Sequence, residues 1–350
     1  MEWADWGGWP PLLGLFGGVL LGVAARRGRF CTLGAIEDAL YADSWNRIRM
    51  WAIALAVAIA GTFALARFGA VHLDQTLYSR IGWNPVASIA GGLLFGYGMA
   101  IAGNCGYGAL ARLGGGDLRS LVIVIVIGVF AYMVLAGPLA PLRMAFFPPG
   151  EVPPEGASGF AHLASGGLGI DPLWPALAVA AAMLAWALAD ERFRRSRDQI
   201  LWGAVVGVAI LTGWAGTSWL ADHSFDVIPI ESHSFTAPPG ETLLFLMTAG
   251  NEVISFSIGS VFGVVLGALI GSISKGHFRW EACDDPGELG RQIMGGALMG
   301  VGGVLAAGCS VGQGLTAFST LAYSAPVVLG AIFLGAAFGL RQLIRGFQAT

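Results

Sequence analysis

One segment of the chain occurs twice. It reads GGLLFGYGMAIAGNCGYGALARLGGG at residues 91–116 and returns as GGALMGVGGVLAAGCSVGQGLTAF at residues 295–318. The offset is the same for the leading glycines (295 − 91 = 204) and for the cysteines (309 − 105 = 204), so the copies align without a gap. Each copy predicts an apolar helix, a Gly and Cys break and a short returning piece. Breaks at matching positions of two halves are typical of the substrate site of a membrane transporter, because non-helical backbone survives in a bilayer only where it is buried or lines a cavity.

Helix packing is the alternative explanation for this motif. Small residues favour close contact between helices, and a free cysteine is often only a small buried side chain. On this reading the glycines at 92, 96, 296 and 300 form a packing seam, and the two thiols are inert.

The chain as a whole is strongly apolar. Its mean hydropathy is +0.70, and only 12% of its 350 residues are charged, against about 25% in soluble domains. This predicts an all-α polytopic membrane protein, with residues 1–350 forming a single transmembrane domain in the lipid bilayer. The net charge of −3 and the scattered basic clusters predict no nucleic-acid partner. The cysteines form no CxxC pair and have no histidine at ligand spacing, so neither a metal site nor a cofactor is expected.

Apolar runs of about 20 residues predict nine membrane crossings. They lie at about residues 10–25, 50–70, 84–103, 118–142, 172–189, 199–219, 253–273, 290–308 and 325–345. Arginine and lysine follow the first, fifth, seventh and ninth runs, so the positive-inside rule places the N-terminus outside and the C-terminus in the cytoplasm. The long connections 143–171 and 220–242 then lie outside, where we expect His162, His223 and His233 to be solvated.

A fainter repeat extends the similarity between the two ends of the chain. ARRGRFC at residues 25–31 matches ISKGHFR at residues 273–279. Together the repeats predict two pseudo-symmetric halves, about residues 10–142 and 199–345, and the number of crossings between the motifs favours an inverted relation. The stretch TLGAIEDAL after Cys31 is too short to span, so it predicts either a re-entrant half-helix or a surface amphipathic helix.

The motifs GRFCTLG, GNCGYG and GCSVGQG resemble those of the YeeE/YedE sulfur-transport family, and the resemblance covers about residues 10–345. It implies a permease of the bacterial inner membrane that imports thiosulfate, not an enzyme, with an hourglass shape that narrows at membrane depth. It further implies that Cys31, Cys105 and Cys309 line the path. A cytoplasmic TusA-like sulfur-carrier protein is a candidate partner. Cys283 lies outside these motifs, and we expect an ordinary loop thiol there.

The chemistry of thiosulfate, a dianion with a soft terminal sulfur, suits such a path. Thiols offer weak S–H donors, and the amides that begin half-helices after Cys105 and Cys309 offer partial positive charge. Arginines buried on the path would hold the dianion too tightly, and Arg112 would either attract anions or only anchor a helix end. We expect glycines that permit positive φ and close backbone approach, together with polar groups, to support the path. These supporting residues are Asn104, Gly106, Gly108, Ser310, Gly312 and Gln313.

Two other functions remain open from the sequence. The transported species would be sulfite, sulfide or a selenium compound in the first. In the second, the same three cysteines would serve a membrane thiol-disulfide oxidoreductase. Redox cysteines are typically exposed and poised beside a resolving partner, and none of the three has a partner nearby in the sequence. The absence of a GxxxxGK[ST] motif disfavours transport driven by a nucleotide.

Overall fold

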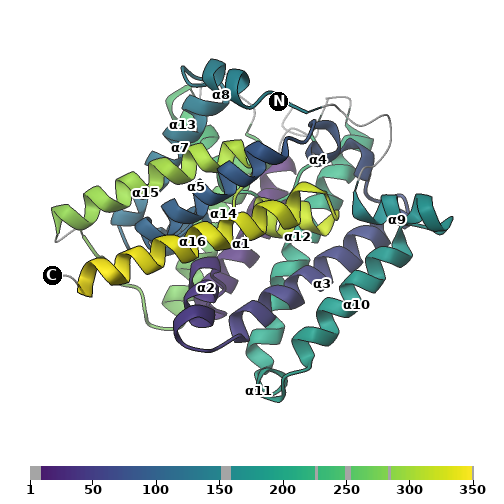
Figure 1. Cartoon of the computed structure of the whole chain (residues 1–350), viewed down its shortest axis with the longest axis horizontal. Helices are drawn as coiled ribbons and strands as arrows, with labels where there is room; N and C mark the ends of the chain where they lie inside the picture. The colour runs from purple at the N-terminus through teal and green to yellow at the C-terminus, as the bar shows by residue number, and fades with distance from the viewer. Residues whose placement is uncertain (1–8, 151–158, 225–227, 249–253, 283–284, 349–350) are drawn as a thin grey trace, which may run out of the picture.

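The computed structural model describes residues 9–150, 159–224, 228–248, 254–282 and 285–348, and Cys283 therefore lies outside the described residues. In these ranges the chain is helical, with only isolated bridges of β type (Figure 1). The helices are α1 (Trp9–Arg27), α2 (Thr32–Tyr41), α3 (Asn46–Arg67), η1 (Leu73–Gln75), α4 (Leu77–Arg80), α5 (Pro85–Ala102), α6 (Gly106–Gly114), α7 (Arg119–Leu135), α8 (Ala140–Phe146), α9 (Phe160–Leu168), α10 (Leu173–Leu188), α11 (Glu191–Arg195), α12 (Arg197–His223), α13 (Pro238–Thr248), α14 (Phe256–Ser274), α15 (Pro286–Leu305), η2 (Gly312–Ala317) and α16 (Ser324–Gln348).

A long helix lies at each predicted crossing, namely α1, α3, α5, α7, α10, α12, α14, α15 and α16. By length and composition, six described helical spans can cross a membrane, or seven if α7 and α8, which are bent by 61° at their junction, count as one. Two of the nine helices are not among these spans: α10 is apolar but has only 16 residues, and α15 carries Glu288 and Arg291 near its start. The chain is a multi-pass membrane protein.

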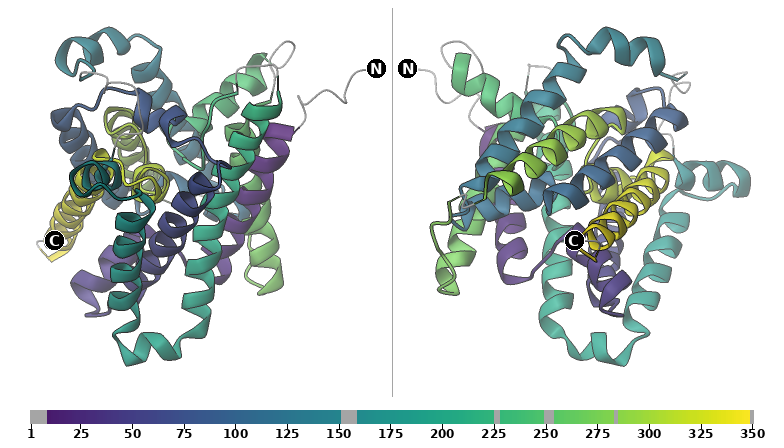
Figure 2. Two further views of the ribbon diagram at one scale, coloured as in Figure 1. Left: turned by 90° about the vertical axis from the view of Figure 1, so that its right-hand side faces the viewer. Right: turned by 60° about the vertical axis from the view of Figure 1, so that its left-hand side comes forward.

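The long helices pack in two groups (Figures 1 and 2). In one group the neighbours follow the order α10, α3, α12, α1 and α14, and in the other the order α7, α15, α5 and α16. The short helices that follow the cysteines join the groups: α2 contacts α3 and α16, α6 contacts α14 and α7, and η2 contacts α16 and α12. The breaks in the helices therefore meet between the two groups.

Helices α1 and α14 run side by side in the same direction. A Cβ atom added to Gly14 would lie 2.0 Å from the carbonyl oxygen of Phe256, and one added to Gly22 would lie 2.2 Å from that of Val264. Such distances leave no room for a methyl group. Glycine therefore sets the separation of the two helices along their length.

Helices α5 and α15, which carry the two copies of the Cys motif, run in opposite directions. A Cβ on Gly91 would lie 2.6 Å from the carbonyl oxygen of Gly302, and one on Gly98 would lie 2.6 Å from that of Gly295. An inverted relation between the two copies requires this antiparallel arrangement. The division of the chain into two halves with the stated boundaries stays a prediction.

The glycine stripe of each motif lies at helix contacts, as the packing reading requires. A Cβ on Gly96 would lie 2.1 Å from the carbonyl oxygen of Ile332 in α16, and one on Gly300 would lie 2.7 Å from that of Ile127 in α7. The stripe thus holds the second group together. The cysteine breaks at the ends of the stripes are a separate feature.

Candidate functional site

Each of the three cysteines that the sequence places on a path lies at the start of a short helical segment, where its sulfur accepts a backbone N–H. Cys31 caps α2, Cys105 caps α6, and Cys309 precedes η2. The donors are the amides of Gly34 at 3.5 Å, Gly108 at 3.4 Å and Gly312 at 3.3 Å, respectively. A side-chain acceptor at this position satisfies an amide that the helix leaves free. All three motifs share the spacing Cys-x-x-Gly, so this common cap is visible in the sequence.

The three breaks meet at Ser310. Its Oγ accepts a hydrogen bond from Thr32 Oγ1 at 3.1 Å, next to Cys31 in the chain. The Cys105 thiol also lies near Ser310, and it is close enough to Cys31 and Cys309 to interact with both. Cys105 and Cys309 are buried, Cys31 is half-buried, and all three thiols are free. Three thiols from distant parts of the chain therefore form one cluster.

The segment after Cys309 differs from the α-helical half-helix that we expected. It forms one turn of π-helix, Gly312–Ala317, in which the amide of Thr316 donates to the carbonyl of Val311 at 3.0 Å. Single π-helical turns are rare and occur frequently at functional sites. This π-helical turn follows the break after α15, where Ala307 and Gly308 have positive φ.

Gln313 closes the end of α15. Its Nε2 donates to the carbonyl oxygens of Ala306 and Ala307, each at 3.0 Å, and its Oε1 accepts from Ser324 at 3.1 Å. The amide thus satisfies backbone groups that the end of the helix leaves free. A direct role of Gln313 on the path stays a prediction.

The backbone conformation at the breaks corrects one expectation. We expected positive φ at Gly106 and Gly312, but the described residues with positive φ at the two matching breaks are Gly103 (74°) and Ala307 (54°), with Gly308 after it. Each follows the long helix of its motif, where a left-handed residue commonly ends a helix. The turn is therefore made before each cysteine and not after it.

Gly106 and Gly312 are instead required for close approach. A Cβ on Gly106 would lie 2.5 Å from the carbonyl oxygen of Phe235, and one on Gly312 would lie 2.5 Å from Ser234 Oγ. Both glycines of the repeat thus touch the same stretch of chain, residues 228–237, which we call the inserted segment.

The inserted segment connects α12 to α13 and reaches the cysteine cluster. The amide of Phe235 donates to Cys309 Sγ at 3.2 Å. The expectation that His233 is solvated is wrong, because its side chain is buried with Nδ1 2.6 Å from Ser260 Oγ. The polar composition of a loop does not show that its side chains are exposed, because helices remote in the sequence can bury them, as α14 does here. Of the other two histidines, His223 is exposed and His162 is half-buried.

Glu231 ties the inserted segment to two helices. Its carboxylate accepts from Ser257 of α14 at 3.1 Å, and its backbone oxygen accepts from Thr217 of α12 at 2.9 Å. Burial, reinforced by the charge of Glu241, raises the pKa of Glu231 to about 7.

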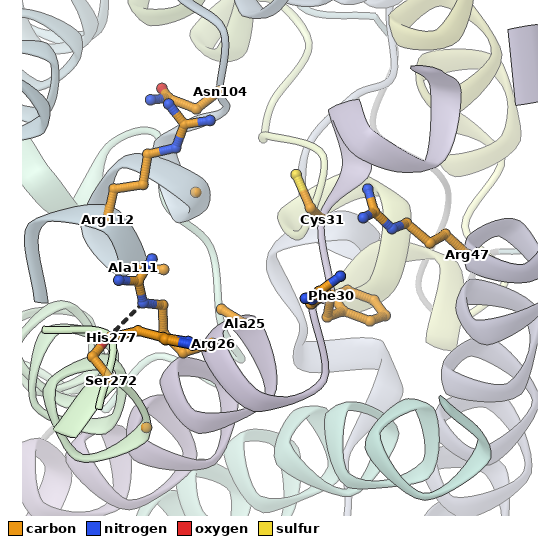
Figure 3. Close-up of a pocket in the computed structure, with 13 residues that line it drawn as sticks. Ala25, Arg26, Phe30, Cys31, Arg47, Asn104, Ala111, Arg112, Ser272 and His277 are labelled. Carbon is orange, nitrogen blue, oxygen red and sulfur yellow. Dashed lines mark hydrogen bonds between the residues drawn. The ribbon is translucent and has the colours of Figure 1, made fainter. Parts of the chain in front are cut away.

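A cavity of about 310 Å³ lies beside Cys31, and we call it the arginine cavity (Figure 3). Its lining residues are Ala25, Arg26, Arg29, Phe30, Cys31, Arg47, Asn104, Gly108, Ala111, Arg112, Gly271, Ser272 and His277. From the sequence, most of these arginines only indicated which side of the membrane faces the cytoplasm. The structure places them around one of the three thiols, while Cys105 and Cys309 lie outside the lining.

Comparisons with known proteins agree with these features. The family model described as sulphur transport matches residues 27–338. The thiosulfate transporter TsuA of Escherichia coli (strain K12) is 26% identical over 93% of this chain and 92% of its own length. The thiosulfate transporter TsuA of Spirochaeta thermophila is 27% identical over 89% of this chain and 92% of its own length. Because the family match covers most of the residues, including all three cysteine motifs, the chain belongs to the sulphur transport family.

Proposed function

We propose that the protein carries thiosulfate across the bacterial inner membrane along Cys309, Cys105 and Cys31. The observation that carries this proposal is the meeting of three free thiols, each at the start of a short helical segment, around Ser310. Two similar proteins are named thiosulfate transporters. We further propose that the N-terminus of the chain lies outside and its C-terminus in the cytoplasm. The arginine cavity then opens to the cytoplasm.

The geometry suits a dianion that must be held weakly. Each sulfur accepts a hydrogen bond from a backbone N–H, and a thiol can also donate its own S–H weakly to the terminal sulfur of thiosulfate. At Cys105 and Cys309, which lie outside the arginine cavity, the starts of the short helices add partial positive charge without a full cation. Several weak sites in series allow an anion to enter and to leave.

A redox function is the alternative from another class. It would need two cysteines to form a disulfide and a partner to accept the electrons. We propose transport without chemistry at the thiols, so that the protein is not an enzyme. A TusA-like carrier that takes up the sulfur is proposed to dock at the cytoplasmic end.

Uptake of labelled thiosulfate into proteoliposomes tests the path. We expect Cys105→Ala and Cys309→Ala to lose uptake about 10-fold or more, whereas Cys105→Ser and Cys309→Ser keep part of it, because a hydroxyl replaces a hydrogen-bonding thiol but not a redox thiol. Competition with unlabelled sulfite and sulfide identifies the preferred anion.

Cys283→Ser serves as the control for cysteine removal and should transport normally. Normal uptake by Cys105→Ala would refute the path. Equal loss in the serine and alanine variants, together with a disulfide trapped between two of the thiols, would favour the oxidoreductase.

A further inference from the structure

The arginine cavity contains an amide without a partner. Asn104 is 2% exposed, and neither its Oδ1 nor its Nδ2 has a hydrogen-bond partner among the residues that the structure describes. A buried polar group left unsatisfied is destabilising, so such groups are rare in folded proteins. Asn104 lines the cavity between the end of α5 and the start of α6. Its amide is therefore placed to bind something that enters the cavity.

The charge of the cavity is positive. Four arginines and His277 belong to its lining, and no carboxylate does among the residues that the structure describes. Arg47 is paired, because its Nε lies 3.1 Å from Asp38. Arg26 donates to Ser272 Oγ at 2.6 Å and Arg112 to the carbonyl of Gly103 at 3.0 Å, and both of these acceptors are neutral.

Carboxylates packed near the cavity do not cancel this charge. Asp117 and Glu281 lie beside Arg26 and Arg112 in an adjoining hollow, where both carboxylates pair with Arg119 at 3.1 Å and 3.4 Å. Glu37 on α2 also lies near enough to Arg47 and Arg112 to interact with them. None of these carboxylates lines the cavity, whereas all four arginines do. A diffusible anion would complete the balance.

Three groups converge on the same space. Figure 3 shows the guanidinium of Arg112 beside the amide of Asn104 on one wall and the sulfur of Cys31 on the other. Arg112 donates to the carbonyl of Gly103, the residue before Asn104, so its guanidinium is held next to Asn104. Gly108 on the same wall contributes no side chain that would fill the space. A volume of about 310 Å³ holds a tetrahedral anion with several waters, since a water takes about 30 Å³.

We propose that the arginine cavity is a binding site for a small doubly charged oxyanion, held by Arg112 and Asn104. Charge-assisted hydrogen bonds from guanidinium to oxyanions are stronger than neutral ones, and the amide of Asn104 would gain the partner that it lacks. Cys31 lines the site but Cys105 and Cys309 do not, so an anion such as sulfate can occupy it without reaching those two thiols.

A consequence follows for transport, and this part rests on the proposed function. If thiosulfate leaves through the arginine cavity, dianions on that side compete with it for the same site. Sulfate trapped inside vesicles should then slow thiosulfate uptake. The cavity would make uptake sensitive to the oxyanions that have already accumulated.

Equilibrium dialysis of the purified protein with labelled sulfate tests the site directly. We expect one saturable site that phosphate displaces and chloride does not. Asn104→Asp adds a negative charge at nearly constant size, and Arg112→Gln removes the guanidinium. Each should weaken sulfate binding about 10-fold or more, as expected for a lost interaction of about 1.4 kcal/mol or more. Unfolding temperatures followed by tryptophan fluorescence show whether each variant is folded.

Two control variants separate this site from the rest of the protein. Arg27→Gln removes a neighbouring arginine that does not line the cavity, and Cys309→Ala alters the proposed path. Both should bind sulfate like the original chain. No saturable sulfate binding, or unchanged affinity in both Asn104→Asp and Arg112→Gln, would overturn the proposal. If sulfate binds as expected while Cys309→Ala still transports thiosulfate, the proposed path fails and the cavity site stands.

Discussion

At the scale of single residues, the two copies of the motif solve one backbone problem with different side chains. Gly103 and Ala307 occupy equivalent positions (307 − 103 = 204), and both have positive φ. Glycine takes this conformation at no steric cost, whereas a Cβ makes it unfavourable by about 1–2 kcal/mol. The second break therefore holds strain that the first one lacks.

Exchanging the two residues should change stability in opposite directions. Gly103→Ala should lower the free energy of unfolding by about 1 kcal/mol, because open space surrounds Gly103 and the cost is purely conformational. Ala307→Gly should leave stability equal or higher, since the relieved strain offsets the greater flexibility of glycine in the unfolded chain. Thermal unfolding of both variants in one detergent measures the effect. A lower midpoint for Ala307→Gly than for Gly103→Ala would contradict this account.

At the scale of elements, the inserted segment lies between the two copies of the motif. It touches the repeat at Gly106 and Gly312 and donates to Cys309. Hydropathy detected the half-helices, since an apolar piece shorter than a span stands out between glycines. It could not detect the inserted segment, because its residues are held at depth by partners on α12, α14 and η2 that are remote in the sequence.

A methyl group at Gly106 should displace the inserted segment. The Cβ of Gly106→Ala would meet the carbonyl oxygen of Phe235, a backbone atom that cannot rotate away. We expect thiosulfate uptake to fall about 10-fold or more while the protein still purifies as a single species, because the shift removes a hydrogen bond from Cys309. Gly330→Ala in α16 is the matched control, since a Cβ there meets open space and should add up to about 1 kcal/mol of helix stability. Normal uptake by both variants would show that the position of the inserted segment does not affect transport.

At the scale of the whole molecule, local and distant effects divide what the sequence can predict. All nine apolar runs correspond to helices, because the burial of about 20 residues in lipid is decided within each run. The repeated motif also singled out Cys105, Cys309 and Ser310, which the structure brings together. The arginine cavity was missed, since Arg26, Arg47 and Arg112 are far apart in the chain and converge only through the packing of the two helix groups.

The stability of the whole molecule should depend on pH through Glu231. Its pKa is about 7 in the folded protein against an ordinary value of 4.5, so the protonated carboxyl favours the folded state. This contribution is complete below about pH 4.5 and is lost as the pH rises through 7. We expect the unfolding temperature to fall between pH 5 and 8, and Glu231→Gln, which cannot ionise, to flatten the profile. Equal slopes in the two proteins would show that other groups set the dependence.

The thiol cluster has a consequence for the biosynthesis of the protein. Its members stand at positions 31, 105 and 309, so the cluster requires segments that are far apart in the sequence. During synthesis the first two thiols enter the membrane long before the third leaves the ribosome. A nascent chain therefore lacks one of the three thiols of the proposed path until Cys309 has been synthesised.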